Sequence, residues 1–232
     1  MPEIKPQGPV SIKQYGIVDL VICIDTTGSM SDVIEAVKSN VATHLIGGIK
    51  TQMAKNQSPL DWRARVIGYG DLNEGEAIYE SAFTSNESEL TNTVMNIPRT
   101  GGGDEPESTF DAMVVASQSP WRTDTAAHRV VILFTDASPI PELHSNTLPS
   151  GPRDVDEVIS QLISQKVKLF LYGPQNTMYE KLKLLPKAQI TLFPPEKTHD
   201  NLQSLVDFSK EFEQMAKTIS GDLLNTPGLA SA

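Results

Sequence analysis

An apolar run that ends in a carboxylate is the feature that most limits how this chain can fold. Leu20-Val-Ile-Cys-Ile24 is apolar without alternation, and Asp25 follows it directly. Such runs are typical of strands buried on both faces of a parallel sheet. Two hydroxyls follow at Thr27 and Ser29, before apolar residues recur at helical spacing. In open α/β sheets the loops at the carboxyl ends of central strands bind ligands, so we expect a ligand site here.

The rest of the chain alternates between strand-like and helix-like segments. Strands are predicted over 20–24, 61–69, 77–83, 130–134, 167–172 and 190–193, and the third of these is expected to be a short antiparallel edge strand. Helices are predicted over 30–50, 87–97, 106–118, 154–165, 177–185 and 201–219, with Pro106 at the first position of its helix. This order predicts an α/β fold: a three-layer, doubly wound, Rossmann-like sheet, mainly parallel, with helices on both faces.

Length and charge restrict the organisation and the class of partner. The 232 residues, 39% of them hydrophobic, fit one domain over 17–220, with an N-terminal extension (1–16) and a disordered tail (221–232). A net charge of -10 argues against a nucleic-acid or anionic-membrane binder. No apolar segment suits a signal peptide or a membrane span, and we therefore expect a cytoplasmic protein. The oligomeric state cannot be predicted from these features.

The single cysteine and the four histidines offer no zinc site. Cys23 lies inside the apolar run and is expected to be a buried, inert thiol. The histidines show no ligand spacing with one another or with the cysteine. In contrast, Asp25, Thr27 and Ser29 place three oxygen ligands on one turn, a set that suits a hard cation such as Mg²⁺.

Three separate loops together resemble the von Willebrand factor A domain family, over about residues 17–220. The family's metal-ion-dependent adhesion site uses Asp-x-Ser-x-Ser after the first strand, and Asp25-x-Thr27-x-Ser29 matches it with one Thr for Ser. Thr135-Asp136 after a later strand resembles the family's Thr-Asp-Gly, with Ala137 in place of Gly. The resemblance implies that Asp25, Thr27, Ser29 and Asp136 bind Mg²⁺, with Mn²⁺ or Ca²⁺ as substitutes, and that Asp136 binds through water.

The second loop departs from the adhesion-receptor pattern. Gly101-Gly-Gly-Asp104-Glu-Pro106-Glu107 resembles a variant of stand-alone members, and Pro106 stands where the receptors carry a ligand Thr. We predict that Asp104 replaces that ligand, with Glu107 as the alternative. Asp71 resembles a family residue after the second strand and is expected to play a structural role.

The resemblance implies a protein-interaction module and no enzymatic activity. The expected partner is a protein that supplies an Asp or Glu to the metal, and the expected role is an intracellular adaptor, of the kind found in bacterial stress, defence, AAA+ or kinase-associated systems. Three alternatives remain at this stage. Asp25 and its neighbouring hydroxyls could only cap a helix. The chain could be a Mg²⁺-dependent phosphatase, although Thr27 stands where such enzymes carry their acid, or a metal-free structural subunit.

Overall fold

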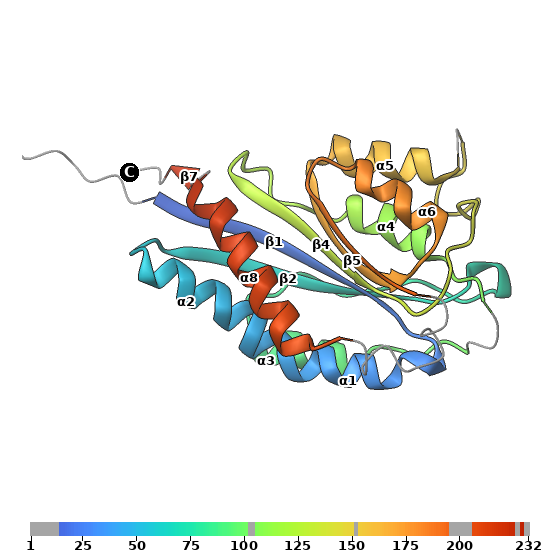
Figure 1. The fold of residues 1–232 in the computed structure, drawn as a ribbon, viewed down its shortest axis with the longest axis horizontal. Coiled ribbons are helices and arrows are strands. Elements are labelled where there is room, and N and C mark those ends of the chain that lie inside the picture. The colour runs from blue at the N-terminus through green and yellow to red at the C-terminus, as the bar shows by residue number, and fades with distance from the viewer. Residues whose placement is uncertain (1–13, 102–104, 151–152, 195–205, 226–227, 230–232) are drawn as a thin grey trace, which may run out of the picture.

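A computed structural model describes residues 14–101, 105–150, 153–194, 206–225 and 228–229. One sheet holds six strands in the order β3-β2-β1-β4-β5-β6 (Figure 1). They are β1 (Gln14–Asp25), β2 (Leu60–Tyr69), β3 (Tyr79–Glu80), β4 (Ala127–Phe134), β5 (Val167–Pro174) and β6 (Ala188–Phe193). All neighbouring pairs are parallel except β2 with the edge strand β3. A two-residue strand, β7 (Gly228–Leu229), also pairs antiparallel with the start of β1. The predicted α/β fold class is confirmed.

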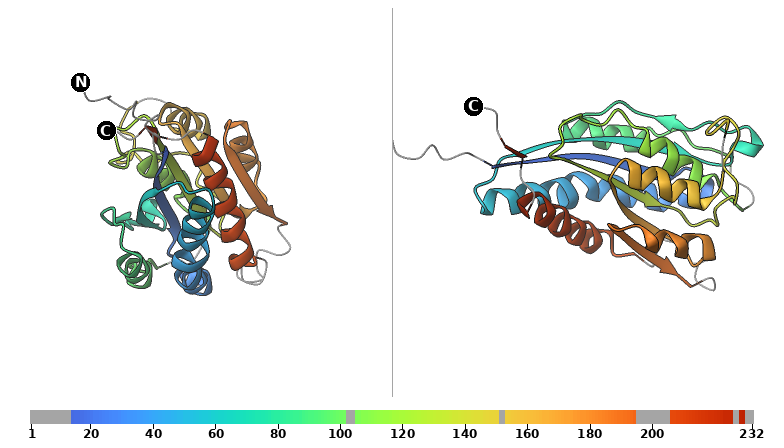
Figure 2. Two further views of the ribbon diagram at one scale, coloured as in Figure 1. Left: turned by 90° about the vertical axis from the view of Figure 1, so that its left-hand side faces the viewer. Right: turned by 90° about the horizontal axis from the view of Figure 1, so that it is seen from above.

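Helices cover both faces of this sheet, as Figures 1 and 2 show. One layer comprises α1 (Ser31–Asn40), the π-helical segment η2 (Val41–Ile46), α2 (Gly47–Lys55), α3 (Glu87–Met95) and α8 (Phe208–Asn225). The other comprises α4 (Thr109–Ser117), α5 (Val155–Ser164), α6 (Thr177–Lys181) and the short 3-10 helix η4 (Leu182–Leu184). The remaining short 3-10 helices are η1 (Gly28–Met30) and η3 (Leu72–Glu74). No helix in the described ranges is long and apolar enough to cross a membrane.

The first strand contributes to both hydrophobic cores, which explains its uninterrupted apolar sequence. Leu20, Ile22 and Ile24 pack on the side of α1, α2 and α8, whereas Val21 and Cys23 pack on the side of α4 and α5. All five are fully buried, and each large aliphatic side chain among them contributes roughly 1.5–3 kcal/mol. Cys23 is a buried free thiol, as predicted.

Asp19, the buried acid in the first half of β1, is held by an ion cluster. Asp19 is fully buried and accepts bonds from Arg63 Nε (2.8 Å) and Nη2 (2.7 Å). The backbone N–H of Arg122 also donates to Asp19 Oδ2 (2.8 Å), and its guanidinium lies 3.4 Å from Oδ1. Two arginines therefore compensate the carboxylate that the strand carries into the core.

Five predicted boundaries are wrong. β1 begins at Gln14, so the N-terminal extension is shorter than predicted, and residues 1–13 lie outside the described part. The first helical region continues to Lys55 and contains the π-helical segment, while the third strand shrinks to two residues. The other two differences concern α4 and α8.

The helix predicted from Pro106 begins only at Thr109, because the residues before it pair with another loop. Glu107 N donates to Ser138 O (2.9 Å), and Ile140 N donates to Glu107 O (2.8 Å). This bridge holds Glu107 extended against the loop that follows β4.

The predicted disordered tail is wrong for residues 221–225, which belong to α8. Leu223 is 1% exposed in the core, and Asp222 accepts a bond from Lys168 (2.7 Å). Gly221 does not end the helix, because the buried face continues beyond it through Leu223.

Candidate functional site

The candidate site lies where the direction of sheet winding reverses. The chain leaves β1 toward β2 on one side, and it leaves β4 toward β5 on the other. Asp25 is in register with Tyr69 of β2, and Ile24 with Phe134 of β4, so the carboxyl ends of the three central strands meet. Such a switch point opens a crevice between the loops, which is where doubly wound sheets bind ligands.

Asp25 is the most deeply placed of the predicted ligands. Its side chain is fully buried, and its Oδ1 accepts bonds from Thr27 N (3.0 Å) and Thr27 Oγ1 (2.6 Å). Its Oδ2 accepts a bond from Thr135 Oγ1 (3.0 Å), which comes from the loop after β4. Three donors from two loops therefore fix the orientation of the carboxylate.

The electrostatic environment of Asp25 nevertheless disfavours its charge. Burial, with a smaller effect of the nearby Asp136 charge, raises the pKa of Asp25 from an ordinary value of 3.8 to about 6, against the opposing hydrogen bonds from Thr27 and Thr135. A buried carboxylate with a like charge beside it gains from a nearby cation.

Thr27 and Ser29 place two hydroxyl groups on the loop that follows β1. Thr27 is 4% exposed and Ser29 is exposed, and their hydroxyl oxygens lie 3.4 Å apart. Thr27 is the N-cap of η1, but its side chain makes no capping bond. Its hydroxyl instead donates to Asp25, so helix capping alone does not explain Thr27.

Asp136 brings the loop after β4 to the same place. A hydrogen bond from Ser29 links it to the first loop and lowers its pKa, but burial has the larger effect and the pKa of Asp136 is raised. The preceding Thr135 bonds Asp25, and its Oγ1 accepts a bond from Ala137 N (3.1 Å). The structure thus brings four of the five predicted ligands together: Asp25, Thr27, Ser29 and Asp136.

The fifth predicted ligand, Asp104, lies outside the described residues, but its alternative Glu107 is described. Glu107 is 3% exposed, and no donor in the described part of the chain lies within hydrogen-bonding distance of its Oε2. The pKa of Glu107 is raised to about 8, first by burial and then by the neighbouring carboxylates Asp25, Glu76, Asp71 and Asp136, in that order. A buried acid surrounded by other acids, with an unpartnered oxygen, fits a site that holds a cation.

The donor set is entirely oxygen, which suits Mg²⁺. Within the described residues, no group of three or more Asp, Glu, His or Cys side chains is placed to hold a metal ion. The candidate set has a different composition, because it combines the two carboxylates Asp25 and Asp136 with the hydroxyls of Thr27 and Ser29.

Asp71 and three residues that sequence reasoning did not assign support these loops. Asp71 caps η3 by accepting a bond from Asn73 N (2.7 Å), a structural role as predicted. The Tyr179 hydroxyl lies 3.0 Å from Thr109 Oγ1 and 3.0 Å from Ala137 O, beneath the loop that carries Asp136. The carboxylate of Glu76 bonds two backbone N–H groups from two different loops. No local sequence pattern marks Tyr179, Thr109 or Glu76, because their roles depend on contacts between distant segments.

Comparisons with known proteins agree with this geometry at the level of the fold. The pilus adhesin SpaC of Lactobacillus rhamnosus GG, in its open conformation, superposes with a TM-score of 0.58 at 14% identity, covering 93% of this chain and 31% of the adhesin. The α-protein kinase vwkA of Dictyostelium discoideum is 27% identical over 220 residues, which is 90% of this chain. The chain spans only 33% of the length of that kinase.

The model of one protein family matches almost the whole described region. That family is the von Willebrand factor A domain, and the match runs over residues 19–226. It includes β1 from Asp19 onward, the loops that carry Asp25 and Asp136, and all of α8. The chain therefore belongs to the von Willebrand factor A domain family.

Proposed function

We propose that this domain binds Mg²⁺ at the carboxyl ends of β1 and β4 and uses it to capture an acidic residue of a protein partner. Domains of this family mediate contacts between proteins, which supports a protein partner. The observation that carries the proposal is the meeting of Asp25, Thr27, Ser29 and Asp136 around a buried carboxylate cluster. Mn²⁺ or Ca²⁺ would be substitutes.

The residues divide into ligands and supports. Asp25, Thr27, Ser29 and Asp136 would hold the ion, together with either Asp104 or Glu107 from the glycine-rich loop. When bound, the ion supplies an electrophilic position that a partner's carboxylate can fill. Thr135 holds Asp25 in place through its bond to Oδ2. Because Thr27 and Ser29 contribute no charge and Asp136 would bind through water, these ligands neutralise the ion only in part, and the ion keeps an attraction for an external acid.

The net negative charge of the chain favours binding of an acidic partner at the metal site, because the rest of the surface does not attract such a partner. With a net charge of -10, the surface as a whole repels an acidic partner, so binding would depend on the ion. We further propose that the domain acts as a non-catalytic adaptor in the cytoplasm. In this role the site has to bind a carboxylate and needs no group that transfers a proton or forms a covalent bond.

A capture experiment tests this proposal. The immobilised domain is incubated with a lysate of its source organism in Mg²⁺ or in EDTA, and the retained proteins are compared between wild type, Asp25→Ala and Glu35→Ala. Glu35 is an exposed residue of α1 that forms an ion pair with Lys38 (3.0 Å), so its variant removes one acidic charge from a helix surface. We expect a protein retained in Mg²⁺ by wild type and Glu35→Ala and lost in EDTA or with Asp25→Ala. Capture that survives both EDTA and Asp25→Ala would refute the mechanism.

A further inference from the structure

Glu76 connects two of the loops that meet at the candidate site. The chain leaves β2, forms η3, and reverses at Gly75, whose φ of +83° lies in the left-handed region that favours glycine. The reversal places the Glu76 carboxylate beside two backbone amides. Its Oε2 accepts a bond from Asp71 N (2.8 Å), and its Oε1 accepts one from Gly101 N (2.6 Å).

The space that this carboxylate occupies exists only because residue 70 is glycine. A Cβ atom at Gly70 would lie 1.9 Å from Glu76 Oε2 and 2.5 Å from Thr100 Oγ1. Thr100 is itself held by the first loop, since Thr100 N donates to Thr26 O (3.2 Å). Glu76 therefore fills a prepared position between the end of β2 and the start of the glycine-rich loop.

The segment from Gly101 to Ser108 is attached to the same turn at both ends. At its far end, Ser108 N donates to Gly70 O (3.2 Å), and Leu72 N donates to Ser108 Oγ (2.9 Å). At its near end, Glu76 makes the attachment through Gly101. The described residues nearest these attachments are Gly101 at one end and Glu107 at the other, so both ends are fixed to the turn after β2.

In the described part of the chain, the Glu76 carboxylate has backbone N–H groups and no basic side chain as its partners. Within the described residues no salt bridge includes Glu76, and it lies in a region rich in carboxylates. A charged acceptor makes stronger bonds to N–H groups than a neutral one, and a carboxylate can accept at both oxygens, which a glutamine cannot do.

We propose that Glu76 is a positioning residue of this site: it holds Gly101 against the end of β2, beside the loops that carry Asp25 and Glu107. The inference rests on the proposed function. Residues that orient metal ligands from behind typically contribute about 10- to 100-fold to metal affinity.

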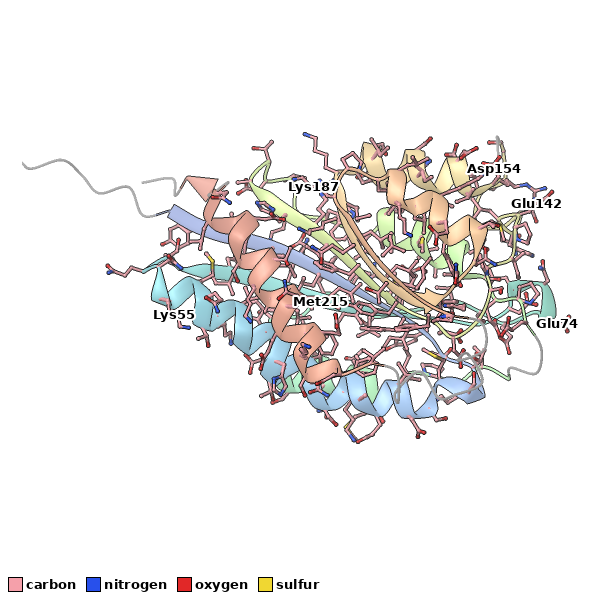
Figure 3. The ribbon with its side chains drawn as sticks, viewed as in Figure 1. Lys55, Glu74, Glu142, Asp154, Lys187 and Met215 are labelled. Carbon is pink, nitrogen blue, oxygen red and sulfur yellow. The ribbon has the colours of Figure 1, made fainter. Side chains whose placement is uncertain are left out.

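Three variants separate position from charge. Glu76→Asp keeps the charge but is one methylene too short to reach both amides. Glu76→Gln keeps the length but turns an NH₂ group toward one of the two N–H donors. Glu74→Gln is the matched control, because Glu74 is exposed on the same turn (Figure 3), and its loss removes the same charge from the same loop.

Mg²⁺ affinity is measured by isothermal titration calorimetry for these variants, for wild type and for Asp25→Ala, with thermal melts in EDTA to confirm folding. We expect Glu76→Asp and Glu76→Gln to bind Mg²⁺ about tenfold or more weakly, and Glu74→Gln to bind like wild type, because solvent screens an exposed charge. Equal affinity in Glu76→Asp and wild type would overturn the inference and leave the proposed function standing.

A second measurement needs no metal. In EDTA, the backbone amides of Gly101 and Asp71 should exchange hydrogen more slowly in wild type and Glu74→Gln than in Glu76→Asp, as followed by NMR. Equal exchange in wild type and Glu76→Asp would show that Glu76 does not hold the loop, whatever the metal does. If wild type binds no Mg²⁺ at all, the proposed function fails, and the positioning role fails with it.

Discussion

Replacing Asp25 by Asn should remove a pH dependence from the stability of the metal-free protein. The Asp25 carboxyl has a folded pKa of about 6 and an ordinary value of 3.8, so between these values the folded state binds more protons than the unfolded state. Stability from this group is therefore full below pH 3.8 and is lost as the pH rises through 6. A difference of about two pKa units corresponds to about 3 kcal/mol in total, of which between about 1 and 2 kcal/mol is lost above pH 5.

The Asn side chain fits the same hydrogen bonds. Its oxygen can replace Oδ1 as the acceptor from Thr27, and its NH₂ group can donate to Thr135 Oγ1. The Thr135 hydroxyl can then turn toward Ala137 O, 3.4 Å away. We therefore expect the variant to fold and to differ from wild type mainly in charge.

The assay is urea denaturation in EDTA at pH 5 and pH 7.5, with the free energy of unfolding extrapolated to water. We expect wild type to lose more stability than Asp25→Asn over this interval, by between about 1 and 2 kcal/mol. Mg²⁺ at pH 7.5 should restore stability to wild type only. An equal loss in both proteins would refute the reasoning, because it would show that Asp25 does not carry the buried charge.

Three further predictions follow from the packing and the ion cluster. Asp19→Ala leaves two arginines without their buried partner and should lower the free energy of unfolding by about 3–5 kcal/mol in urea denaturation. A loss below about 1 kcal/mol would show that water solvates the two arginines in place of Asp19. Gly70→Ala should destabilise the folded protein by about 1–3 kcal/mol through overpacking. Gly28→Ala is the control and should melt like wild type, because a Cβ atom there meets nothing within 4 Å. Similar melting points for the two variants would contradict the close packing at Gly70. Truncation after Ser220 removes the buried Leu223 and should cost about 2–5 kcal/mol, and an unchanged melting point would place the end of α8 outside the core.

The sequence predicts those parts of the site that depend on local patterns. The apolar run before Asp25 and the one before Asp136 each identify a buried strand, and the carboxyl ends of parallel strands lie at one edge of a sheet. The hydroxyls of Thr27 and Ser29 follow within four residues of the first strand. For these reasons the sequence places four of the predicted ligands on loops that the structure brings together.

The remaining parts depend on contacts between distant segments. The start of α4 is delayed because Glu107 pairs with the loop after β4, and nothing near Pro106 in the sequence indicates that pairing. Glu76 acquires its role only when the β2 turn meets Gly101. In contrast, Leu223 continues the four-residue spacing of Met215 and Ile219 on the buried face of α8, so this part of the helix follows a local pattern that the predicted boundary omits.

If the hydroxyl of Thr27 belongs to a metal site, its removal should weaken Mg²⁺ binding in a calorimetric titration of wild type, Thr27→Ser and Thr27→Val. Ser keeps the hydroxyl, whereas Val keeps the shape of Thr and removes the oxygen. We expect saturable binding at one site in wild type and Thr27→Ser, and binding at least about tenfold weaker in Thr27→Val. Equal binding in all three proteins, or no binding in wild type, would show that Thr27 does not hold a metal ion.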